Sequence, residues 1–120
     1  MLIGYANSKL QKMATQSAVA KKELSARSAA LVVLRLTQLS AFENLGQIPP
    51  RAAPLHLHLL TMQRKGRKNQ QGQFVIKLHG GDGIVFRPAG EFQKLDDGTP
   101  DASTVTQVEL VLIGNYHGKK

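Results

Sequence analysis

The chain of 120 residues is predicted to fold as one α+β domain, residues 1–120, in which an N-terminal strand and two helices pack on a mainly antiparallel, twisted sheet. Apolar residues recur at three- and four-residue steps before residue 40, as in helices, and at two-residue steps after residue 54, as in strands. Hydrophobic residues make up 42% of the chain, enough for one compact core but not for two. The order of the two patterns places the helices before most of the sheet.

The N-terminal part is predicted to contain the first strand and both helices. The apolar segment 2–5 is expected to be a short strand, and a side-chain oxygen of Asn7 or Ser8 is expected to cap a helix that runs through Met13. A second helix is predicted from about residue 18 to residue 39, because this stretch has no glycine or proline. Its buried stripe is predicted to consist of Ala29, Val32, Val33, Leu36 and Leu39.

The rest of the chain is predicted to form strands. Two prolines at 49–50 end the helical region, since proline lacks the amide hydrogen that a helix needs. In segment 55–59 leucines alternate with His56 and His58, which predicts a half-buried strand with both imidazoles on its polar side. Further along the chain we expect a strand over 74–78, a turn over 80–83, a strand over 84–86 and a last strand over 105–113.

The charge of the chain favours a polyanionic partner. Sixteen Lys and Arg against eight Asp and Glu give a net charge of +8. Residues 1–81 carry twelve basic residues against Glu23 and Glu43, whereas residues 82–120 carry four against six acidic ones. The absence of cysteine excludes disulfides, thiolate metal sites and a thiol nucleophile. No signal peptide or membrane span is apparent, so a soluble cytoplasmic protein is expected.

A basic cluster lies between two of the predicted strands. As a hairpin tip it would project four cations with little apolar cover, which suits contacts with phosphates, although a solvated loop has the same composition. The candidate RNA-binding residues of this cluster are Arg64, Lys65, Arg67 and Lys68.

Histidines supply the candidate proton-transfer groups. His56 and His58 would share one face of a strand, but no acidic residue or cysteine is near them in sequence, so we expect no metal site. His56 is interpreted as a surface histidine and His58 as an acid–base group. The C-terminal segment offers a stacking ring, a second titratable imidazole and phosphate-binding charge, in Tyr116, His117 and Lys119. A frayed tail would have the same composition.

Several of these segments together resemble the HigB-like branch of the RelE/ParE toxin superfamily, over nearly the whole chain. The resemblance rests on the element order, His58-Leu59-Leu60 before a basic stretch, Gly72-Gln73-Phe74-Val75-Ile76-Lys77, Ile84-Val85-Phe86-Arg87-Pro88 and the terminal Tyr116-His117. It implies a RelE/ParE-like fold and the toxin of a type II toxin–antitoxin pair. Such a toxin cuts messenger RNA on the ribosome without a metal or other cofactor, and a HigA-like, helix-turn-helix antitoxin neutralises it.

The resemblance also implies roles for particular residues. His58 and His117 would be the acid–base groups, Lys77 would stabilise the phosphate, and Tyr116 would stack on a base or position the substrate. Lys119 and the basic cluster would hold the RNA backbone.

Two positions depart from the pattern of the family. Asn115 stands where relatives have aspartate at the catalytic ending, and Gly83 stands where they have an arginine that contacts phosphate. Arg87 would face the same side of a regular strand as Gly83 and could replace that contact as an RNA-binding residue. Two alternatives remain open: a non-catalytic ParE-like inhibitor of DNA gyrase, and a degenerate toxin that only binds its antitoxin, which the two departures support.

Overall fold

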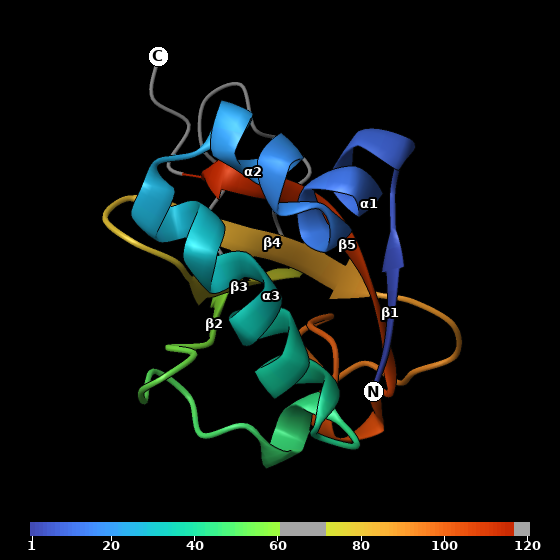
Figure 1. Cartoon of the computed structure of the whole chain (residues 1–120). Coiled ribbons are helices and arrows are strands. Elements are labelled where there is room, and N and C mark those ends of the chain that lie inside the picture. The colour runs from blue at the N-terminus through green and yellow to red at the C-terminus, as the bar shows by residue number, and fades with distance from the viewer. Residues whose placement is uncertain (61–71, 117–120) are drawn as a thin grey trace.

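The computed structural model describes residues 1–60 and 72–116, which form a five-stranded mixed sheet with three α-helices (Figure 1), so the α+β class is confirmed. In chain order the elements are β1 (Leu2–Tyr5), α1 (Ser8–Thr15), α2 (Ser17–Glu23), α3 (Ala26–Ser40), the 3₁₀ turn η1 (Leu45–Gln47), β2 (His58–Leu60), β3 (Gln73–Lys77), β4 (Asp82–Pro88), the 3₁₀ turn η3 (Ala102–Thr104) and β5 (Gln107–Asn115).

The strands lie across the sheet in the order β1-β5-β4-β3-β2. The three pairs formed by β2 to β5 are antiparallel, as predicted, whereas β1 pairs parallel with β5, with Leu2 opposite Gln107. The sheet is therefore mixed, with three antiparallel pairs and one parallel pair, in which the last strand lies beside the first. The register of β4 and β5 shifts between Val85 and Phe86, which is a β-bulge.

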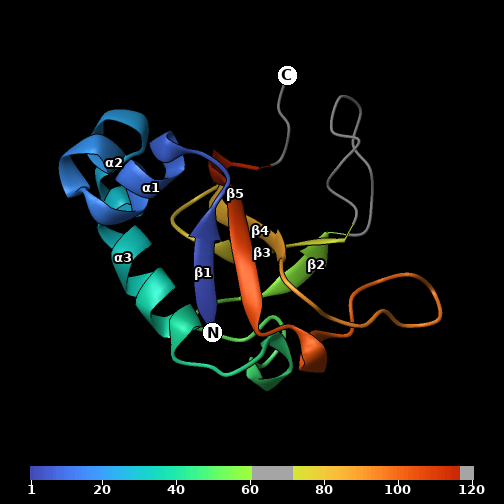
Figure 2. The same ribbon diagram turned by 90° about the vertical axis from the view of Figure 1, so that its right-hand side faces the viewer.

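The two faces of the sheet differ in cover. All three helices lie on one side (Figure 2), and the main core lies between them and the sheet. The other side, called the open face below, carries a smaller apolar cluster of Val75, Val85 and Tyr116. The predicted alternation in β3 is confirmed, because Phe74 and Ile76 belong to the main core and Val75 belongs to the open face.

The prediction of one long helix over residues 18–39 is wrong, because the chain forms α2 and α3 there. The backbone is extended at Leu24 and Ser25, between the two helices. The hydroxyl oxygen of Ser25 accepts a 3.2 Å hydrogen bond from the amide of Ser28 and thereby caps α3. The fold thus has three helices rather than two, and a serine makes the break without any glycine or proline.

The predicted stripe of α3 needs one correction. Four of its five residues are buried, but Val33 is 51% exposed, since it follows Val32 directly and points about 100° away from it around the helix. In α1, the side chain of Asn7 rather than that of Ser8 provides the cap, because its Oδ1 accepts a 2.9 Å hydrogen bond from the amide of Leu10.

Replacing the cap of α3 is expected to weaken the fold measurably. Ser25→Ala removes the oxygen that accepts from the Ser28 amide, so the free energy of unfolding should fall by about 1 kcal/mol in urea titrations. The matched control is Ser17→Ala, which changes an exposed serine of α2 and should leave the unfolding midpoint almost unchanged. Equal midpoints for the two variants would show that the cap contributes nothing.

The strand predicted over 55–59 begins later, since β2 spans His58–Leu60. Leu55 and Leu57 are buried, as their alternation predicted, but they precede the strand. The φ of His56 is 50°, which lies in the left-handed region and interrupts an extended backbone.

The other boundaries move by about two residues. β5 begins at Gln107 rather than at residue 105, because the chain before it forms η3. The turn after β3 is present, with Gly80 at a φ of 63°, but β4 already begins at Asp82. These shifts leave the predicted hairpin of β3 and β4 intact.

Candidate functional site

A pocket of about 240 Å³, called the polar pocket below, lies beside the edge strand β2. Its lining residues are Arg51, His56, His58, Lys77 and Tyr116. Their side chains supply a guanidinium, two imidazoles, an ammonium and a phenol, and none of these lining residues is acidic. Such a set of donors is suited to an anion.

The pairing of β2 with β3 places two of these side chains on the open face. His58 lies opposite Val75, which belongs to the open-face cluster. Lys77 follows Val75 by two residues in the same strand and therefore shares its face. The amide of Lys77 also donates a 2.9 Å hydrogen bond to the carbonyl of Leu55, which ties the preceding loop to β3.

Tyr116 reaches the polar pocket because Gly83 leaves space for its ring. The ring is 6% exposed, and its centroid lies 6.2 Å from that of the His58 imidazole, at an interplanar angle of 55°. A Cβ at position 83 would lie 2.9 Å from Cδ1 of Tyr116 and 2.8 Å from Cγ2 of Val75, closer than carbon atoms pack. The ring of Tyr116 thus occupies the space that a side chain at position 83 would need.

Arg51 and His56 enter the polar pocket from a loop with unusual backbone angles. Their φ values are 57° and 50°, in the left-handed region, which costs a residue other than glycine roughly 1–2 kcal/mol. Two 2.8 Å backbone hydrogen bonds hold the loop, from the Arg51 amide to the carbonyl of Leu57 and from the His56 amide to the carbonyl of Ala52. Backbone strain of this kind is concentrated at functional sites.

The structure brings together in the polar pocket three residues that the sequence predicted, His58, Lys77 and Tyr116. His56 also lines the pocket and is exposed, which confirms its interpretation as a surface histidine, whereas Arg51 was not predicted. The prediction that His56 and His58 share one face of a strand is wrong, because His56 precedes β2 and has a left-handed φ. Nothing in the sequence around Arg51 indicates that its side chain lies beside the two histidines.

Asn115 directly precedes Tyr116 but faces the other side of the sheet. It pairs with Asp82, whose carboxylate accepts a 2.7 Å hydrogen bond from the hydroxyl of the buried Ser28 in α3. Because directly paired residues share a face, Asn115 belongs to the helix-covered side, whereas Tyr116 lies on the open face. Asn115 is not among the residues that line the polar pocket.

Arg87 is on the open face but at the other end of β4. It lies roughly 13 Å along the strand from Gly83, at 3.3 Å per residue. Its Nε donates a 2.8 Å hydrogen bond to Oε1 of Glu109 on β5, so its charge is partly neutralised there. It does not line the polar pocket.

The remaining candidates lie outside the described residues: Arg64, Lys65, Arg67, Lys68, His117 and Lys119. Within residues 1–60 and 72–116, no group of three or more His, Asp or Glu side chains is placed to hold a metal ion. In the same ranges, no helix is both long and apolar enough to span a membrane.

No protein-family model, characterised protein or solved structure was found to match this chain. The polar pocket and the open face around it are therefore the features from which a function is inferred.

Replacing Arg51 with glycine should separate its charge from its backbone strain. Arg51→Gly removes the guanidinium from the polar pocket, so binding of an anion, with inorganic phosphate as the probe, should weaken about tenfold or more. The free energy of unfolding should change by less than about 0.5 kcal/mol, because relief of the left-handed φ offsets the entropy of an unfolded glycine.

The comparison variant is Arg51→Ala, which loses the same charge but keeps the strained φ. It should bind phosphate as weakly as Arg51→Gly and be less stable in urea titrations. Wild-type affinity for phosphate in both variants would show that Arg51 takes no part in anion binding.

Proposed function

We propose that the protein is a ribosome-dependent endoribonuclease that cuts messenger RNA without a metal ion, and that it is the toxin of a type II toxin–antitoxin pair, as its resemblance to HigB-like toxins implies. The observation that carries the proposal is the polar pocket, where proton-transfer groups and cationic groups lie together and no lining residue is acidic. Translation stops when the message is cut.

The reaction that fits this set of side chains is an internal transesterification. The ribose 2′-oxygen attacks the adjacent phosphorus, the bond from phosphorus to the 5′-oxygen breaks, and the products are a 2′,3′-cyclic phosphate and a 5′-hydroxyl. One group must take the proton of the 2′-hydroxyl, and another must give a proton to the 5′-oxygen. The phosphate becomes more negative in the transition state, so nearby cations lower the barrier.

Each lining residue then has a role in the proposal. His58 exchanges a proton with the substrate, with His117 as the second acid–base group, since imidazole gains and loses protons near neutral pH. Lys77 and Arg51 stabilise the charge on the phosphate. Tyr116, in contact range of His58, stacks on a base or positions the ribose.

The polar pocket also bears on the alternative of a degenerate toxin. That alternative rested on the loss of a carboxylate at Asn115 and of an arginine at Gly83. Arg51 supplies a guanidinium in the pocket without help from position 83, and Tyr116 uses the space at Gly83. Both observations support a catalytic protein over a degenerate one.

The proposed partners follow from the same function. The ribosome and messenger RNA are the polyanionic partners of a chain with a net charge of +8. A HigA-like, helix-turn-helix antitoxin neutralises the toxin, and both proteins act in the cytoplasm, where the ribosomes are.

The test is to induce the protein in a bacterial host and to map the 5′ ends of messenger RNA. Growth arrest with cuts in phase with the reading frame, each leaving a 5′-hydroxyl, is the expected result. Intact messages together with DNA-damage signalling would instead identify a gyrase inhibitor. Normal growth with intact messages would favour a degenerate toxin.

A further inference from the structure

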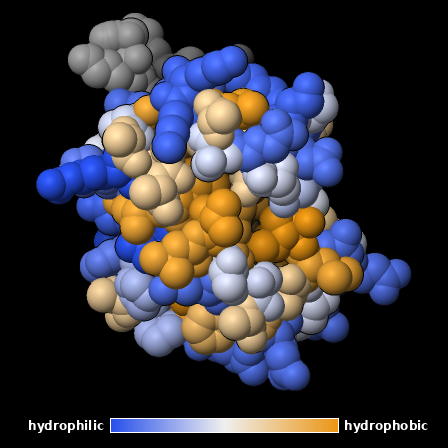
Figure 3. Space-filling model, in the orientation of Figure 1, coloured by the Kyte–Doolittle hydropathy of each residue, from blue (hydrophilic) through white to orange (hydrophobic). Residues whose placement is uncertain are grey.

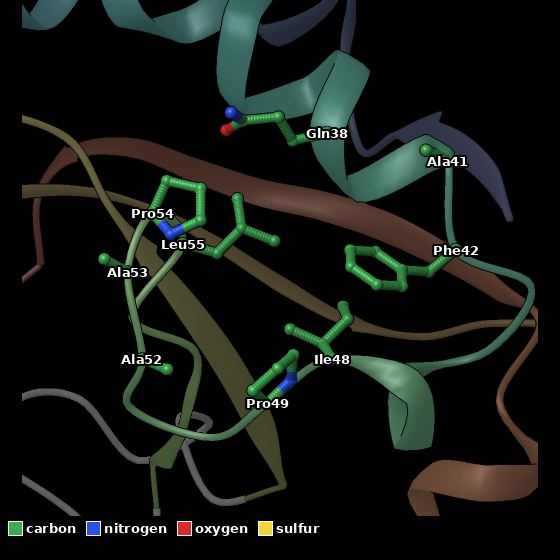
Figure 4. A pocket seen from close by; sticks show the side chains of 9 residues that line it. All are labelled: Gln38, Ala41, Phe42, Ile48, Pro49, Ala52, Ala53, Pro54 and Leu55. Carbon is green, nitrogen blue, oxygen red and sulfur yellow. The ribbon is translucent and has the colours of Figure 1, made fainter.

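An apolar pocket lies between the end of α3 and the loop that leads to β2 (Figure 4). Its volume is about 260 Å³, and the side chains of Phe42, Ile48 and Leu55 surround the space. Pockets for drug-sized molecules have about 300–1,000 Å³, so this one is better matched to a single large side chain. It has the size of a site for one anchor residue of a partner protein.

The exposed side of α3 extends this apolar surface. Val33 is 51% exposed and Leu34 is 48% exposed. Leu34 precedes Gln38 by four residues and Ala41 by seven, so the three share a helix face, and the latter two line the apolar pocket. Hydrophobic residues gather in the middle of this side of the molecule, with hydrophilic ones around them (Figure 3). We call Val33, Leu34 and the apolar pocket together the α3 groove.

Helices α1 to α3 are basic. The acidic residues of segment 8–43 are Glu23, whose carboxylate lies 3.4 Å from Nζ of Lys9, and Glu43, which follows Phe42 of the apolar pocket. The basic residues of the same segment are Lys9, Lys12, Lys21, Lys22, Arg27 and Arg35. An acidic partner is therefore attracted to this side, whereas a second copy of the same basic helices is repelled.

We propose that the α3 groove binds an acidic, amphipathic helix of a partner protein. Its apolar residues would follow the face of α3 at four- and seven-residue steps, with one aromatic side chain in the apolar pocket. Its aspartates and glutamates would face the lysines and arginines of the helical layer. The size of the pocket, the exposed stripe and the sign of the charge together select this occupant.

The bound helix would also control the polar pocket. Residues 49 and 52–55 line the apolar pocket, and Arg51 and His56, from the same loop, line the polar pocket. A partner that packs against one side of this loop fixes the positions of Arg51 and His56 on its other side. This second part rests on the proposed function, whereas the docking itself does not.

The absence of tryptophan from the chain gives a direct binding assay. The probe is a synthetic peptide of about 18 residues, long enough to form a helix, with one tryptophan, leucines four and seven residues after it, and glutamates on the opposite face. Titration with the intact protein should change the tryptophan fluorescence with a dissociation constant below about 100 μM. Leu34→Glu should weaken the binding at least about tenfold, because it places a like charge in the groove.

The matched control is Leu95→Glu, which changes a leucine of similar exposure, 51%, in another part of the chain. It should change the dissociation constant less than about twofold. A scrambled peptide of the same composition should bind at least about tenfold more weakly. The proposal is overturned by no saturable binding, by equal effects of the two leucine variants, or by self-association of the protein that Leu34→Glu abolishes.

The regulatory part has its own readout. Peptide binding should shift the imidazole NMR signals of His56 and leave those of the exposed His79 unchanged, and an unchanged His56 signal would refute the coupling. None of these measurements uses RNA. A chain that binds the peptide but cuts no message therefore refutes only the proposed function, and a chain that cuts messages but binds no peptide refutes only the docking.

Discussion

His58→Ala is expected to lower the rate of messenger RNA cleavage by a factor of about 10²–10⁴, the usual contribution of a general acid or base. His58 lines the polar pocket beside Tyr116 and lies on the open face of the sheet. The rate is measured on programmed ribosomes with saturating protein, so that weaker binding does not lower it. The thermal unfolding midpoint should stay within a few degrees of the wild type, because His58 is only partly buried.

The matched control uses another histidine of the chain. His79 is exposed, lies outside the polar pocket and contacts Ser28 only through backbone atoms, so His79→Ala should cut at the wild-type rate. The catalytic proposal fails if the combined replacement of His58 and His117 by alanine leaves toxicity and cleavage unchanged in cells.

Gly83→Ala is expected to destabilise the protein by about 1–3 kcal/mol, as is usual when a methyl group is added to a packed site. The new Cβ would meet Val75 and the Tyr116 ring at less than 3.0 Å. Val75 is fully buried and cannot move away, so the ring must shift from its place beside His58. We therefore expect cleavage to fall as well, measured at a temperature where the variant remains folded.

Gly4→Ala provides the control for this substitution. Gly4 is also a strand glycine, but a Cβ there would meet only a backbone oxygen at 3.8 Å, which is an ordinary contact. The free energy of unfolding should stay the same or rise by up to about 1 kcal/mol, because alanine has less conformational freedom than glycine in the unfolded chain. If both variants lost equal stability, the close contact at Gly83 could not be the cause.

The parts of the fold that could be predicted from the sequence are those set by local patterns. The alternation in 74–78 gave both the strand and its buried side, and the Gly-rich turn gave the β3–β4 hairpin. The break at Ser25 was missed, because a serine is compatible with a helix as well as with its cap. The parallel pairing of β1 with β5 was missed because it joins the two ends of the chain, and no local pattern indicates the direction of such a pair.

In the candidate site, too, some residues could be predicted from local patterns, whereas others depend on the whole fold. His58, Lys77 and Tyr116 could be named from residue type and from the resemblance, and the strand register then places them together. Arg51 could not, because its place in the pocket depends on the fold of the loop before β2, where its φ is left-handed. The need for a glycine at position 83 could not be predicted either, since it depends on where the ring of Tyr116 lies in the structure.

The pairing of β1 with β5 has a consequence for synthesis of the chain. Leu2 pairs with Gln107, so β1 has no neighbouring strand until residue 107 has been synthesised. Closing the loop between these two residues is slow compared with local folding. Tyr116 follows β5 directly, so the polar pocket is incomplete until the chain has been made through Tyr116. A nascent chain that ends before this residue therefore lacks the assembled pocket.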